Sequence, residues 1–109
     1  MMSSSFYLFY IFISLFLFIS LLVSPEIIKP PPNMTVDVGD SILMECVARG
    51  FPIPRIRWFL NNKALPNNGS VIEIDELTLN HTGVYLCVAE NVAGNATATA
   101  TLSVMGESF

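Results

Sequence analysis

The chain has 109 residues, a formal net charge of −4 and two cysteines, and its five lysines and arginines are scattered rather than clustered. This length predicts one small domain, and a negative charge without a basic cluster argues against nucleic-acid binding. A domain of about eighty residues buries only about 60% of its unfolded surface, so a covalent cross-link matters to its stability. The pair of cysteines therefore predicts a structural disulfide in an oxidising compartment.

The N-terminal segment contains an uncharged apolar run over residues 6–23. As a helix this run would span about 27 Å, near the thickness of the hydrocarbon core of a bilayer. Two interpretations of residues 1–24 stay open, a cleaved signal peptide and an uncleaved signal anchor. The position before a disulfide-bearing domain favours the first, whereas the lack of a preceding Lys or Arg and of a clean cleavage site favours the second. Both predict delivery outside the cytosol, as a secreted or a cell-surface protein, and the membrane is involved only if residues 6–23 are retained.

Residues 25–32 contain four prolines. Proline fixes φ and donates no backbone hydrogen bond, so this segment predicts an extended linker that runs into an edge strand. A folded domain is expected over residues 33–105, and residues 106–109 are expected to form a tail.

Alternation of apolar and polar residues predicts strands over residues 34–38, 41–48, 55–60, 71–79, 83–90 and 96–104. Asn61, Asn62 and Lys63 predict a tight turn, and residues 91–95 a hairpin in which Gly94 is free to take positive φ. The side chains expected to face the core are Ile42, Met44, Cys46, Ala48, Ile56, Trp58, Leu60, Ile72, Ile74, Leu77, Tyr85, Cys87, Ala89, Ala98, Ala100, Leu102 and Val104.

Cys46 and Cys87 frame the domain, with Trp58 between them and Tyr85 two residues before the second cysteine. This spacing, together with Gly50-Phe51-Pro52-Ile53-Pro54 and Cys87-x-Ala89-x-Asn91-x-x-Gly94, resembles an I-set immunoglobulin domain of the kind found in hemicentin, peroxidasin and leucine-rich-repeat adhesion proteins. The resemblance implies an all-β, two-sheet sandwich behind the apolar leader helix. It also implies that Trp58 lies against the Cys46–Cys87 bridge and that the Tyr85 hydroxyl turns back to the backbone near Asn80.

The chain departs from that family between Trp58 and the strand that begins at Val71. The family carries a longer region there, so the C′–D region is expected to be shortened and strand D to be absent or vestigial. The family also places Asp where this chain has His81, and that Asp pairs with a basic residue near strand D. We expect the pair to have been lost together with the strand.

No set of residues predicts catalysis, a cofactor or a metal. His81 is the one histidine and lies on a predicted turn, and Glu73 and Asp75 face outward as solubilising charges. We expect neither an enzyme nor a small-molecule substrate.

Four N-x-S/T sequons start at Asn33, Asn68, Asn80 and Asn95, each at a predicted strand edge or turn. Chance produces such triplets in an asparagine-rich chain, but four in one small domain predict that at least two carry glycans.

A candidate interface lies on the outer face of the sheet formed by the predicted strands C, F and G. Arg55, Arg57, Phe59, Leu86 and Val88 share this face with Val84 and the threonines of the last strand. Aromatic, apolar and arginine side chains are the favoured interface composition, although exposed apolar residues also occur on sheets without any partner. The sequence thus predicts a non-catalytic extracellular recognition or adhesion module that binds a protein partner or another copy of itself. The alternative is a structural spacer unit of a larger multi-domain protein.

Overall fold

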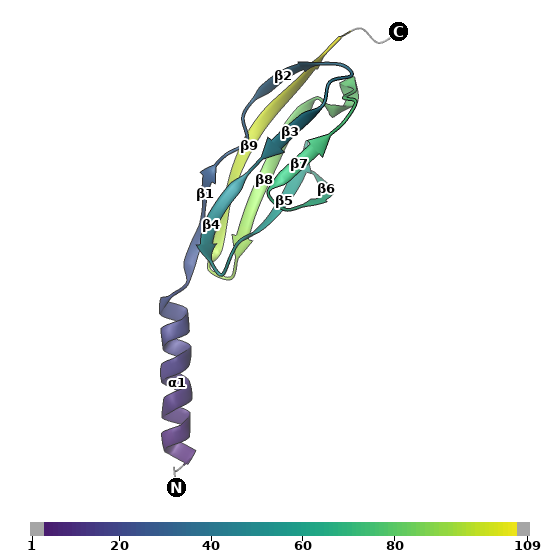
Figure 1. The fold of residues 1–109 in the computed structure, drawn as a ribbon. Coiled ribbons are helices and arrows are strands. Elements are labelled where there is room, and N and C mark those ends of the chain that lie inside the picture. Colours follow the sequence, from purple (N-terminus) through teal and green to yellow (C-terminus); the bar gives the residue numbers. More distant parts are fainter. Residues whose placement is uncertain (1–3, 107–109) are drawn as a thin grey trace.

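The computed structural model describes residues 4–106, which form one helix followed by a β-sandwich (Figure 1). The helix projects from one end of the sandwich and the described C-terminal end lies at the other, so the molecule is elongated, with extents of 81 × 21 × 19 Å. The predicted tail falls largely outside this range, since only Gly106 of residues 106–109 is described.

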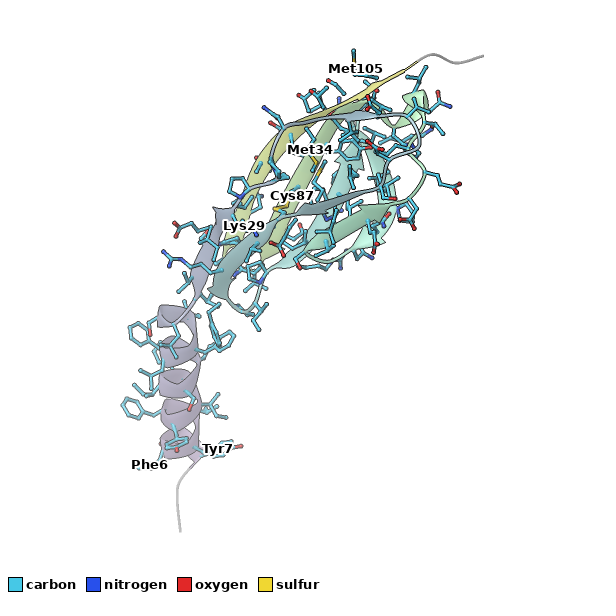
Figure 2. All side chains as sticks on the ribbon, turned by 45° about the horizontal axis from the view of Figure 1, so that its top comes forward. Phe6, Tyr7, Lys29, Met34, Cys87 and Met105 are labelled. Atoms are coloured by element: carbon cyan, nitrogen blue, oxygen red, sulfur yellow. A yellow bond between two sulfur atoms is a disulfide. The ribbon has the colours of Figure 1, made fainter. Side chains whose placement is uncertain are left out.

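Helix α1 spans Ser4–Ser20, and its side chains project outward on all sides (Figure 2). It is shorter than the helix predicted over residues 6–23, because Leu21 and Leu22 close its last turn and Val23 already belongs to a strand. One contact with the sandwich is an edge-on pairing of Phe18 with Phe51, with ring centroids 6.3 Å apart. Over the described residues, no helix combines the length and the apolar character needed to cross a membrane.

The larger sheet has five strands in the order β2-β9-β8-β5-β6. These strands are β2 (Met34–Asp37), β5 (Arg55–Leu60), β6 (Lys63–Asn68), β8 (Gly83–Asn91) and β9 (Gly94–Met105). Strand β2 runs parallel to β9, and the other neighbours are antiparallel. A two-residue turn of Asn61 and Asn62, with φ of 48° and 68°, joins β5 to β6 and matches the primed turns that hairpins favour.

The second layer consists of two antiparallel pairs, β1 (Val23–Lys29) with β4 (Val47–Phe51) and β3 (Ile42–Glu45) with β7 (Val71–Ile74). The predicted strand over 41–48 is therefore divided at Cys46, whose N–H donates to Ser70 O, and it continues to Phe51. Residues 23–29, predicted mainly as a linker, are a paired strand, with a register shift around Pro25, which has no N–H to donate.

The strand predicted over 71–79 is wrong beyond Ile74. Glu76 has φ of 52°, a conformation that no strand accommodates, and a 3₁₀ turn follows at Leu79–His81. Leu77 still reaches the core, and only 1% of its surface is exposed. Its backbone hydrogen bonds to Gly39 and Asp40 hold the loop in place. No strand D occurs between β6 and β7, where only Gly69 and Ser70 intervene.

The core lies between the two layers and contains thirteen buried apolar side chains within the described range. The predicted inward positions of β3, β8 and β9 supply most of them, including Met44, Tyr85, Ala89, Leu102 and Val104. Ala48, Leu60 and Ile74 pack against this cluster while remaining partly exposed. The alternation of each strand thus fixes which side chains are left on the outer faces.

Candidate protein-binding face

The centre of the sandwich fixes the position of the larger sheet. Cys46 and Cys87 form a disulfide between the two layers (Figure 2). Trp58 lies directly opposite Cys87 in the β5–β8 register. The Trp58 indole Nε1 donates to Gly69 O at 2.8 Å, so the buried ring also holds the β6–β7 turn. These contacts tie the larger sheet to the second layer through the centre of the core.

Tyr85, near the start of β8, connects this strand to the preceding 3₁₀ turn. Its hydroxyl donates to His81 O at 2.7 Å, next to the position near Asn80 that the sequence predicted. Burial raises the pKa of the Tyr85 phenol, because the phenolate would lose its hydration. The neutral, donating form of Tyr85 is therefore the form that the fold selects.

We use the name C-F-G face for the outer side chains of β5, β8 and β9. Strand pairing arranges them in rows across the sheet: Phe59 lies beside Leu86 and Leu86 beside Thr99, while Arg57 lies beside Val88 and Val88 beside Thr97. The apolar residues of β5 and β8 are thus central, and the threonines of β9 form one border. The structure places Arg55, Arg57, Phe59, Leu86 and Val88 on this single face.

Arg57 is less free than the sequence suggested. Its Nε lies 3.0 Å from Glu90 Oε1, an ion pair without hydrogen-bond alignment, and its Nη2 lies 3.4 Å from Glu90 Oε2. Its guanidinium also lies 5.6 Å from the Phe59 ring centroid, a cation–π contact. Glu90 was not among the predicted interface residues, although its even spacing from Leu86 and Val88 places it on the same face.

The exposed side chains of the C-F-G face are the threonines along the β9 border and, on β5 and β8, the residues at the two ends of the face. Arg55 is exposed near α1, and Val84 is 46% exposed at the far end, whereas Phe59, Leu86 and Val88 are half-buried among their neighbours. A groove of about 330 Å³ lies beside Val84, lined by Asn61, Asn62, Val84, Leu86 and Thr99. The face is therefore hollowed rather than flat at this end.

The Asn61–Asn62 turn forms one wall of this groove. Asn61 Oδ1 accepts from Val84 N–H at 2.9 Å, and Asn61 N–H donates to Val84 O at 2.9 Å. A Cβ at Gly83 would lie 2.6 Å from the Asn61 side chain, so a larger residue there would force the Asn61 amide to move from its present position. The sequence indicated the turn but not its folding over β8, which depends on contacts distant in sequence.

The four sequon asparagines are all exposed. Asn33 precedes β2, Asn68 ends β6, Asn80 lies in the 3₁₀ turn and Asn95 lies near the start of β9. Asn95 pairs with Glu90 at the α1 end of the C-F-G face, away from the groove beside Val84. Asn33 lies at the other end, where its Oδ1 accepts from the N–H of Thr101, the residue that pairs with Val84, so a glycan on Asn33 would border the groove.

His81 has a structural role on its turn. Its Nδ1 lies 2.9 Å from Thr78 N–H, and together with the Thr78 side chain it closes a capping box around the 3₁₀ turn. Within residues 4–106, no three His, Cys, Asp or Glu side chains gather in a group that could hold a metal ion.

Comparisons with known proteins agree with this architecture. The immunoglobulin domain family matches residues 24–91, so the chain belongs to that family. Human Roundabout homolog 1 is 38% identical over 92 residues, which cover 79% of this chain and 6% of that protein. Peroxidasin of Drosophila melanogaster is 36% identical over 89 residues, covering 73% and 6%. The mouse neural cell adhesion molecule L1-like protein is 36% identical over 85 residues, covering 66% and 7%.

Among solved structures, a chain of the complex of titin M10 with a mutant obscurin-like 1 immunoglobulin domain superposes with a TM-score of 0.73 at 26% identity, covering 81% of this chain and 99% of that chain. The predicted resemblance to immunoglobulin domains, including those of peroxidasin and hemicentin, is confirmed. The chain spans about 6% of the length of the Roundabout and peroxidasin relatives. Domains of this family are generally not catalytic, and the relatives include an adhesion protein.

Proposed function

We propose that this chain is a non-catalytic, extracellular protein-recognition module that binds its partner through the C-F-G face. The observation that carries the proposal is the groove of about 330 Å³ beside Val84 and Leu86, in which Leu86 is the strand neighbour of Phe59. A hollow with apolar walls and polar borders accepts a projecting apolar side chain of another protein. Phe59, stacked under the Arg57 guanidinium, supplies the aromatic and arginine pair that interfaces favour.

Delivery outside the cytosol forms part of the same proposal. The disulfide needs an oxidising compartment, and α1 supplies an uncharged apolar segment directly before the sandwich. We expect the protein secreted from a eukaryotic cell to begin between Leu21 and Pro25. N-terminal sequencing and intact mass of the secreted product measure this start, and a cytosolic product with reduced cysteines would refute the assignment.

The binding test uses the secreted sandwich as a tetramer against a panel of extracellular proteins that includes the module itself. Replacing Phe59 with Ser and Leu86 with Thr should abolish any binding that the wild type shows. The matched control is Leu43→Thr, since Leu43 is 55% exposed on the outer face of the opposite layer. Binding that survives the first pair of changes, or that is lost in the Leu43 control, would remove the C-F-G face from consideration.

Phe59 is half-buried, so its replacement can also perturb the fold. Val84→Lys serves as a second variant, because Val84 is 46% exposed and its replacement places a charge in the groove without opening the core. We expect the melting temperature of Val84→Lys to equal that of the wild type while its binding is lost.

A second candidate is favoured by the small share of each relative that the chain spans. In that case the sandwich is a spacer unit of a larger array, and it would hold its neighbours at a fixed distance without binding through its sheet face. Two results together would favour the spacer. Full-length transcript sequencing would reveal further domains, and proteins with substitutions on the C-F-G face would bind as the wild type does.

A further inference from the structure

A second groove, of about 440 Å³, opens between the two layers at the β6–β7 turn. Its walls come from Val47 on β4, from Ile53 and Pro54 ahead of β5, and from Ile56 on β5. Ala48, Arg55 and the turn residues 68–70 complete the lining. A volume of this size lies within the range of about 300–1,000 Å³ that small-molecule sites occupy.

The groove exists because the chain connects β6 to β7 by Gly69 and Ser70 alone. No strand crosses this side of the sandwich in the part of the chain that the structure describes, so the edge of β7 and the apolar lining of the groove stay uncovered. Ile53, in the segment between β4 and β5 that lines the groove, is 88% exposed, which leaves most of a branched aliphatic side chain in water.

The turn that carries Asn68 is held rigidly against the core. Gly69 N–H donates to Ile56 O at 3.2 Å, Gly69 O accepts from Trp58 Nε1 at 2.8 Å, and Ser70 O accepts from Cys46 N–H at 2.8 Å. These three bonds hold the backbone of the turn, and Asn68, the residue before it, lines the groove. A Cβ at Gly69 would meet nothing within 4 Å, so the space above the turn is open.

Asn68 is also the first residue of the sequon Asn68-Gly69-Ser70. Its side chain is exposed and makes no hydrogen bond to another of the described residues, whereas Asn33 Oδ1 accepts from Thr101 N–H at 2.8 Å. The Asn68 amide nitrogen is thus available for a covalent bond and already lies at the apolar groove.

We infer that Asn68 carries an N-linked glycan whose first N-acetylglucosamine lies in this groove and covers the side of the sandwich that lacks a strand. The inference rests on the proposed delivery through the secretory route, because that compartment supplies the donor, a lipid-pyrophosphate-linked oligosaccharide. In the transfer, the bond from sugar C1 to the pyrophosphate oxygen breaks and the bond from C1 to Asn68 Nδ2 forms. Nδ2 loses one proton, and the lipid pyrophosphate leaves.

The chemistry of the lining fits this sugar. One face of the pyranose ring and the acetamide methyl are apolar, and they match Ile53, Pro54 and Val47. The hydroxyls and the acetamide oxygen accept hydrogen bonds, and Arg55 supplies donors at the rim. Arg49 and Arg57 each form an ion pair with a glutamate, while Arg55 forms none among the described residues.

The test compares two proteins secreted with high-mannose glycans. One keeps only the Asn68 sequon, through Thr35→Ala, Asn80→Gln and Asn95→Gln. Its matched control keeps only the Asn80 sequon, through Thr35→Ala, Asn68→Gln and Asn95→Gln. Endoglycosidase H trims each glycan to a single N-acetylglucosamine, and protein from bacterial periplasmic expression supplies the sugar-free form.

We expect the single sugar on Asn68 to raise the melting temperature by about 4 °C or more, the shift that roughly 1 kcal/mol produces in a domain of this size. The single sugar on Asn80 should leave the melting temperature unchanged. Ile53→Ser should remove the shift at Asn68 while leaving the sugar-free melting temperature unaltered, because Ile53 makes few contacts without the sugar.

Equal shifts for the two sequons, or a shift at Asn68 that survives Ile53→Ser, would overturn the inference. So would intact masses that show sugar on Asn80 and none on Asn68, in which case the proposed delivery stands. A product with no sugar on any sequon and reduced cysteines would instead overturn the proposed delivery and, with it, this inference.

Discussion

Replacing Tyr85 with Phe tests how the fold holds its 3₁₀ turn. The ring is fully buried, and its hydroxyl donates to His81 O at 2.7 Å. Phenylalanine keeps the packing of the ring, so the change removes one donor without opening a cavity. Loss of the bond and of the partner for a half-buried carbonyl costs about 1–2 kcal/mol of unfolding free energy, which lowers the melting temperature by roughly 5–15 °C.

The same variant has a distinct pH signature. Burial raises the pKa of Tyr85 in the folded state above its value of about 10 in the unfolded chain. The contribution of Tyr85 is therefore complete below pH ~10, and it is lost as the pH rises through the folded-state pKa. The difference in stability between the wild type and Tyr85→Phe should consequently shrink at alkaline pH.

Guanidinium unfolding of the sandwich without α1, followed by the fluorescence of the single Trp58, measures both effects. The leader-free protein contains no tyrosine besides Tyr85, so phenolate absorbance follows this residue alone. A stability difference under about 0.5 kcal/mol at neutral pH, within the usual range of surface substitutions, would refute the proposed strength of the hydrogen bond. A difference that stays constant from pH 7 to above the folded-state pKa would refute the reasoning on burial.

Three further changes probe other parts of the sandwich, each through its free energy of unfolding. Replacing Cys46 and Cys87 with Ala should lower the free energy of unfolding by about 4 kcal/mol, because the bridge closes a loop with a sequence separation of 41. A decrease of less than about 1 kcal/mol would contradict this. Trp58→Phe should cost about 1–3 kcal/mol, since Gly69 O loses its donor, and an unchanged free energy would show that water replaces the indole. Asn62→Gly should stabilise by a few tenths of a kcal/mol, because its φ of 68° favours glycine, and a clear loss would mean that the Asn62 side chain matters.

Strand alternation carried most of the fold prediction. In β9, strict alternation placed Ala98, Ala100, Leu102 and Val104 inward; the last three are buried, and Ala98 is half-buried. Each strand has one face against a hydrophobic core, so a shift of one residue would expose a whole set of apolar side chains, and the register is determined by the sequence.

The boundaries of the elements depended on contacts that no local pattern contains. The strand predicted to end at Leu79 stops at Ile74, because Glu76 takes a positive φ and Leu77 bonds to Asp40, which is distant in sequence. The apolar run at the N-terminus likewise gives way to strand at Val23, where pairing with Phe51 outweighs helix propagation.

The candidate site was predictable in its members but not in its shape. Alternation put Phe59, Leu86 and Val88 on one face, whereas the groove needs the Asn61–Asn62 turn to fold over β8. The ion pair of Arg57 with Glu90 depends in the same way on the side-chain rotamers of neighbouring strands, and these are not encoded in any spacing.

The central claim is that a protein partner binds on the C-F-G face. The most direct measurement is methyl NMR of the secreted module, recorded free and after saturation with the partner protein found in the tetramer binding test. If the module binds to itself, spectra at rising concentration replace the saturated sample. The account predicts that the largest shifts occur at the methyl groups of Val84, Leu86 and Val88, while those of Leu43 and Val71 on the opposite layer stay unchanged. Shifts concentrated on Leu43 and Val71, with the β8 methyl groups unmoved, would contradict it.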